Sequence, residues 1–277
     1  MRPTLHMLEK EWLENKVVTT TPIILFVFSI FIAIAMFSNS GHFANFSYQY
    51  SFSGSQTLTS MSGFNFSLAS ILISIAGVVS IALSSAYFPK TLLKEKQEGS
   101  WMFWRSMPVS DLHRHLVKLL FGLIAIPLFC SFFVLAAELL FWIVKLTSGQ
   151  QAGFLLAPLT FTHVVSGWIE FLGRMFIVAI ALLPLAAIAL AVSQRTRSPI
   201  ITMFVAIYLL KLMPILLFGF YGVSHFVSAV IDLPSSALFD TNPLSGFMHA
   251  NMLFLLIYFM LGVAGFMASL RFSKTDE

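Results

Sequence analysis

Residues 119–144 read LLFGLIAIPLFCSFFVLAAELLFWIV, and this stretch decides the class of fold. It carries a single charged side chain, Glu138. As a helix rising about 1.5 Å per residue, it is long enough to cross a hydrocarbon core about 30 Å thick. Similar apolar runs occur elsewhere along the chain, at 17–37, 66–87, 169–192, 199–221 and 251–270. We therefore expect an all-α polytopic membrane protein with six transmembrane helices.

The composition supports this fold class. Of the 277 residues, 58% are hydrophobic and 10% are charged, and the mean hydropathy is +0.87. These values lie far outside the usual range of soluble domains, so we expect one transmembrane domain and no large soluble domain. Cys130 is the only cysteine, which excludes an intramolecular disulfide and a cysteine metal cluster.

The distribution of basic residues predicts the orientation. Most of the 16 Lys and Arg residues fall in segments 1–16, 88–118, 193–198 and 271–277, which six spans would place on one side, whereas Lys145 lies on the other side. The positive-inside rule then makes both termini cytoplasmic in a plasma membrane, the inner membrane of a bacterium. The net charge of +4 follows from this topology, so we expect membrane lipid and no nucleic acid as a partner.

The first 16 residues are predicted to form a cytoplasmic amphipathic helix at the membrane interface. Apolar side chains recur at i, i+3 and i+7, and charged side chains point elsewhere: Leu5, Leu8 and Trp12 against Glu9, Lys10 and Glu14. A cleaved signal peptide is the alternative, because Ala33-Ile34-Ala35 imitates a cleavage site. The long, acidic region before the apolar run argues against cleavage.

The segment 223–233 is apolar but too short to cross a membrane, and Pro234, Asp240 and Pro243 follow it. We interpret 222–250 as an outer loop with a re-entrant or interfacial piece. The other outer segment, 39–65, is expected to form a hairpin or an irregular loop. In the last span, small residues suit close helix packing, either within the chain or between two copies: Gly262, Ala264, Gly265 and Ala268.

Motifs for catalysis are absent from the sequence. It contains no Gly-x-x-x-x-Gly-Lys-Ser/Thr loop for ATP phosphates, no His-Glu-x-x-His and no Gly-x-Ser-x-Gly. His113 and His115 would point to different faces of a helix, so we interpret them as solvated interface residues rather than metal ligands. Four more histidines belong to separate outer segments and are read as polar surface: His42, His163, His225 and His249.

Charged residues within the spans are candidates for function, because burying a charge in a membrane costs several kcal/mol unless it is paired or hydrated. Glu138 and Lys211 lie deep in their spans. We hypothesise that they face the interior of the bundle and line or lock a translocation path. Arg174 could belong to the same path, although an i, i+4 ion pair with Glu170 is the simpler interpretation.

The charged segment 90–118 carries two motifs, Lys94-Glu95-Lys96-Gln97-Glu98-Gly99-Ser100-Trp101 and Ser106-Met107-Pro108-Val109-Ser110. The first is similar to a Glu-Arg/Lys-x-x-Gly-Thr/Ser stretch, and the second to a Leu-Pro-Val-Ser stretch, of the permease subunits of ABC-2 type ABC transporters. The amphipathic N-terminus and six spans also resemble that family. One departure is the aromatic run 101–104, Trp-Met-Phe-Trp, where the family usually has aliphatic residues.

The resemblance implies a function without catalysis on this chain. The loop 88–118 between helices 2 and 3 would be a cytoplasmic coupling loop that docks on an ABC ATP-binding subunit. The residues implied in docking are Lys94, Glu95, Lys96, Glu98, Gly99, Ser100 and Pro108. That partner would hold ATP and Mg, this chain would hold no cofactor or metal, and a second permease half would complete an export path. The alternative is a membrane-embedded lipid-modifying enzyme or a stand-alone carrier that uses Glu138, Glu170 and the outer histidines.

Overall fold

The computed structural model describes residues 2–38, 68–97, 99, 110–148 and 160–275, and these residues form helices and the turns between them. The predicted outer segment 39–65 lies outside the described residues. The helices are α1 Arg2–Glu14, α2 Lys16–Ser38, α4 Leu68–Gln97, α6 Asp111–Leu120, the π-helix η1 Phe121–Ala125, α7 Ile126–Ser148, α9 Phe161–Arg195, α10 Pro199–Phe218, α11 Gly222–Phe239, α12 Ser245–His249 and α13 Met252–Thr275.

Seven helices of the described part are long and apolar enough to cross a membrane. Six of them overlap the predicted apolar runs, and α11 is the additional one. It has 18 residues and continues through Pro234 to Phe239, so it is longer than the predicted segment 223–233. A proline does not end a membrane helix when neighbouring groups satisfy the backbone carbonyl that it frees.

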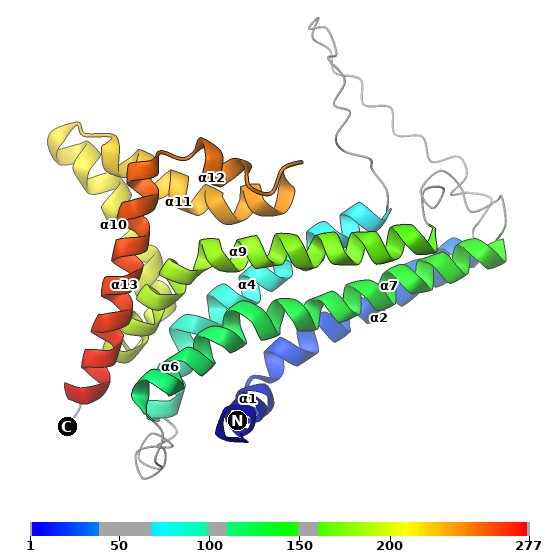
Figure 1. The fold of residues 1–277 in the computed structure, drawn as a ribbon, viewed down its shortest axis with the longest axis horizontal. Helices are drawn as coiled ribbons and strands as arrows, with labels where there is room; N and C mark the ends of the chain where they lie inside the picture. Colours follow the sequence, from blue (N-terminus) through cyan, green and yellow to red (C-terminus); the bar gives the residue numbers. More distant parts are fainter. Residues whose placement is uncertain (1, 39–67, 98, 100–109, 149–159, 276–277) are drawn as a thin grey trace, which may run out of the picture.

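Helix α9 is the centre of the arrangement. It packs against α4, α7, α11 and α13, while α2 packs on α7. In Figure 1, α2, α4, α7 and α9 run side by side, and α10 and α11 lie at the left and upper edges. The N-terminus and the C-terminus both lie in the lower part of the picture. We call this part of the molecule the terminal end.

Glycines bring α13 close to α9. A Cβ atom added to Gly262 would lie 2.6 Å from the Cα atom of Pro184, and one added to Gly265 would lie 3.0 Å from the Cα atom of Ile188. A side chain at Gly262 would clash with the α9 backbone and one at Gly265 would be tightly crowded, so these glycines allow the two backbones to approach. The small-residue face of the last span is therefore used at least in part within the chain.

Helices α6, η1 and α7 follow one another without a break and form one continuous helical segment, which includes Pro127. A proline cannot donate the usual helix hydrogen bond, and a π-helical turn just before it is a common way to absorb the defect. On this turn the Ser84 hydroxyl donates to the Gly122 carbonyl oxygen at 2.7 Å. The bond fixes α4 against the start of α7.

Candidate functional site

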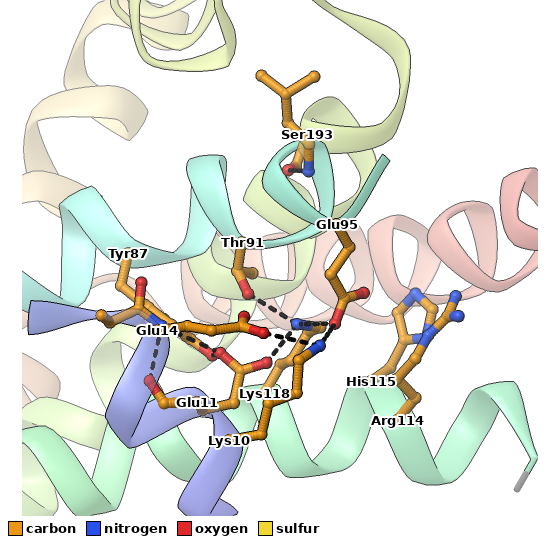
Figure 2. A network of polar contacts seen from close by, with 12 residues as sticks. Lys10, Glu11, Glu14, Tyr87, Thr91, Glu95, Arg114, His115, Lys118 and Ser193 are labelled. Atoms are coloured by element: carbon orange, nitrogen blue, oxygen red, sulfur yellow. Dashed lines mark hydrogen bonds and ion pairs between the residues drawn. The ribbon is translucent and has the colours of Figure 1, made fainter. Parts of the chain in front are cut away.

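A network of buried charges lies at the terminal end, where α1, the last turns of α4 and helix α6 meet (Figure 2). Its centre consists of Glu11, Glu95 and Lys118, all of them buried. Each comes from a different helix. Ion pairs at such a point bind together segments that are far apart in the sequence.

Lys118 is the central cation, with 1% of its surface exposed. Its Nζ atom donates to Glu11 Oε1 at 2.5 Å and to Thr91 Oγ1 at 2.8 Å, and it lies 2.9 Å from Glu95 Oε1. A buried ammonium is stable only when its charge and its donors are matched in this way. Lys118 therefore joins α6 to both α1 and α4.

A second cation balances the charge of the carboxylates. Lys10 Nζ lies 3.2 Å from Glu95 Oε1 and 3.3 Å from Glu14 Oε1. The remaining oxygen of Glu11 accepts from the Tyr87 hydroxyl at 2.7 Å. Lys10 and Glu14 thus take part in the network.

The network changes the picture of the N-terminal helix. A helix is present as predicted, but Met7 and Glu11 are the buried ones among its described side chains, whereas Trp12 is partly exposed. Trp12 packs edge-on against Phe129 of α7, with ring centroids 4.3 Å apart. Helix α1 is therefore held by an ionic contact as well as by apolar packing.

Further polar contacts tie the end of α4 to its neighbours. Lys94 Nζ donates to the Glu14 carbonyl oxygen at 2.8 Å, and Lys96 Nζ donates to the Gln194 carbonyl oxygen at 3.2 Å. The Ser193 hydroxyl accepts from the backbone N–H of Leu93 at 3.1 Å. The last turn of α4 is consequently fastened to the ends of both α1 and α9.

His115 is fully buried, so the prediction of a solvated histidine was wrong. Its Nδ1 atom lies 2.8 Å from the Asp111 carbonyl oxygen, and its Nε2 atom lies 3.1 Å from Gln194 Nε2. Gln194 also donates to Ser269 Oγ at 2.9 Å. His115 therefore helps α6 to pack on α9 and α13, and we assign it a structural role.

A signal for this network was present in the sequence of α6. The leucines at i, i+4 and i+8 are exposed and the charged side chains between them are buried: Leu112, Leu116 and Leu120 against Arg114 and Lys118. This pattern is the reverse of a helix on the surface of a soluble protein. It fits a helix whose apolar side contacts lipid and whose polar side contacts protein.

Four of the seven predicted docking residues lie in the described part of the structure, and three lie outside it. Lys94, Glu95 and Lys96 belong to the last turn of α4 and make the internal contacts described above. Gly99 has a φ of 69°, a left-handed conformation that favours glycine. The remaining three, Glu98, Ser100 and Pro108, lie outside the described residues. Of the predicted loop 88–118, residues 88–97 continue α4 and residues 111–118 belong to α6.

The predicted path residues have separate surroundings. Glu138 is 1% exposed, and among the described residues its Oε2 atom has no hydrogen-bond partner. Its carboxylate lies beside Gly167 of α9. Lys211 belongs to α10, and its Nζ atom donates to Ser228 Oγ of α11 at 3.2 Å. The structure thus places both at helix contacts, but at different ones.

Arg174 forms the predicted ion pair with Glu170, with Nη2 2.9 Å from Oε1. It also donates from Nη1 to the carbonyl oxygens of Leu238, at 3.1 Å, and Asp240, at 2.7 Å. These carbonyls lie at the end of α11, where the helix leaves them without backbone partners. Arg174 therefore anchors the C-terminal end of α11 to α9.

The arrangement joins three helices, α1, α4 and α6, through buried ion pairs. Within the described residues, no group of histidine, cysteine or carboxylate side chains is suited to hold a metal ion.

Comparison with protein-family models, with curated proteins and with solved structures finds no match. The chain is a multi-pass helical membrane protein. Its function has to be inferred from its own residues.

Proposed function

We propose that the chain is the permease subunit of an ABC-2 type ABC transporter, which forms one half of an export path and is driven by a separate ATP-binding subunit. ATP and Mg would be bound by that subunit. The ion network carries the proposal, because its members lie on both sides of segment 98–109, at the end of α4 and on α6. This is the segment with the motifs that resemble a coupling loop.

The network gives a route for force from that segment into the membrane. A push on segment 98–109 reaches α4 through its last turn and α7 through α6 and η1. Lys118 of α6 forms ion pairs with Glu95 of α4 and with Glu11 of α1. A displacement of α4 or α6 would therefore move α1, α4 and α6 together. Rigid elements that join at charged contacts are typical of proteins that switch between two arrangements.

The topology that we propose has six crossings, with both termini cytoplasmic in the bacterial inner membrane. Helix α11 is the one that does not cross. Its 18 residues span about 27 Å at 1.5 Å per residue, just short of the hydrocarbon core. Asp232 lies exposed within it, at high cost in lipid. Arg174 instead holds the end of α11 against α9.

A second permease half fits one face of α10. The side chains on this face recur at helical spacing and are at least half exposed: Ile201, Val205, Leu212 and Leu216. We propose that a second copy, or a related permease, packs on this stripe.

The test is to identify the neighbour of segment 98–109. A photo-crosslinking amino acid at Ser100 should capture a protein that carries a nucleotide-binding motif, and the same probe at the exposed Thr147, near the far end of α7, should not. The captured protein should hydrolyse ATP faster when it is bound to the chain. Transport or lipid modification by the purified chain alone would instead establish the stand-alone carrier or enzyme.

A further inference from the structure

A groove of about 600 Å³ runs along α10, between that helix and α4, α9, α11 and α13. This volume is typical of small-molecule and lipid sites. The walls are mostly apolar, with Ala82 of α4, Leu182 of α9 and Phe204 of α10 among them. Among the described residues that line the groove, Lys211 is the one with a charge.

Lys211 forms no ion pair within 4 Å among the described residues. Its Nζ atom donates to Ser228 Oγ, a neutral hydroxyl that leaves the positive charge uncompensated. A lone ammonium in an apolar membrane environment is unfavourable unless an anion or water accompanies it. Arg174, the other cation within the predicted spans, differs, because it pairs with Glu170.

The groove extends from Lys211 toward the terminal end. Its lining includes Lys211 and Ile200 on α10 and Val78 and Pro89 on α4. At 1.5 Å per residue, the stretch from Lys211 to Ile200 is about 16 Å long. This shape, an elongated apolar channel with a cation near one end, suits an acyl chain attached to an anionic group.

We propose that the groove binds an anionic phospholipid, with its phosphate at Lys211 and one acyl chain between α4 and α10. This proposed lipid site does not depend on whether the chain couples to an ATPase.

A smaller cavity of about 130 Å³ among α2, α4 and α7 is lined by no charged side chain of the described residues, so it offers no basis for selecting an anion.

The test uses the purified full-length chain in nanodiscs that contain a phospholipid with a photoactivatable group on one acyl chain. Phosphatidylglycerol should label peptides of α4 and α10 about tenfold more strongly than phosphatidylcholine does, which corresponds to about 1.4 kcal/mol of binding free energy. Lys211→Met should remove this preference, and Lys211→Arg should keep it. Equal labelling by both lipids, or a preference that survives Lys211→Met, would overturn the proposal.

A second variant tests the acyl-chain part of the site. Ala82→Trp fills the groove without touching the headgroup contacts, and it should reduce labelling by both lipids. Ala264→Trp is the matched control, because Ala264 is exposed on α13 and does not line the groove. Unchanged labelling of Ala82→Trp with a normal unfolding temperature would contradict the proposed path of the chain.

A competing occupant of the groove is a second copy of the chain. Phe204→Cys in a Cys130→Ala background leaves one cysteine, on the groove wall. Spontaneous disulfide dimers in phosphatidylglycerol nanodiscs would show that a partner covers the groove and would overturn the lipid site. The proposal expects this cysteine to form no disulfide with a second copy and to react with a lipid-soluble maleimide more slowly when phosphatidylglycerol is present.

Discussion

The charges at the terminal end and the charges deeper in the spans differ in their partners. Lys118 and Glu95 at the terminal end belong to one network of oppositely charged groups. Glu138 is as buried as they are, yet neither it nor the half-buried Lys211 forms an ion pair among the described residues. Burial alone therefore does not distinguish a charge that holds the fold from one that is available to a ligand.

This difference has an energetic meaning. Removing one member of a buried ion pair leaves an uncompensated charge, whereas removing an isolated charge leaves nothing unpaired. The terminal-end charges should thus affect the free energy of unfolding strongly. The deeper charges should affect it weakly and should matter, if at all, for binding or transport.

The largest effect is expected for Lys118→Met, which leaves Glu11 and Glu95 together without their shared cation. The free energy of unfolding should fall by about 3–5 kcal/mol, measured by equilibrium unfolding in mixed micelles. Lys274→Met is the control, because Lys274 is exposed on α13. If both variants were equally stable, the network would not hold the helices together.

The comparison becomes sharper when one substitution is made in both regions. Glu95→Gln should lower the free energy of unfolding by about 3 kcal/mol, because Lys118 and Lys10 lose a counter-charge. Glu138→Gln keeps the size of the side chain and breaks no ion pair of the described residues, so a change below about 1 kcal/mol is expected. Equal losses of unfolding free energy in Glu95→Gln and Glu138→Gln would show that burial of the carboxylate, rather than its ion pairs, sets the effect of the substitution.

A smaller effect is expected at Arg174. Like the charges at the terminal end it forms an ion pair, but like Glu138 and Lys211 it lies deeper in a span. Arg174→Met frees the carbonyls at the end of α11 and should cost about 1–2 kcal/mol. Glu170→Gln should cost less than about 1 kcal/mol, because the Glu170 side chain is 63% exposed. Hydrogen exchange should increase at the end of α11 only in Arg174→Met. The same increase in Glu170→Gln would mean that the ion pair, not the carbonyl contact, anchors the helix.

The sequence predicted the parts of the fold that depend on neighbouring residues. The apolar runs lie in helices, a helix forms at the N-terminus, and Glu170 pairs with Arg174 at i, i+4. The candidate site was less predictable. Glu95 was predicted to dock on another protein, and its ion pairs with Lys10 and Lys118 of this chain were not predicted. His115 was expected at the surface, because nothing near it in the sequence indicates that α9 and α13 cover it.

The sequence by itself determined that this chain crosses a membrane repeatedly and which segments are helical, because apolar length and helical periodicity are local properties. Only the tertiary structure decided which charges meet. Glu11 and Lys118 are 107 positions apart, and no spacing rule connects residues at that distance. Their pairing depends on how α1, α4 and α6 pack, since a buried charge is stable only where another helix brings its partner.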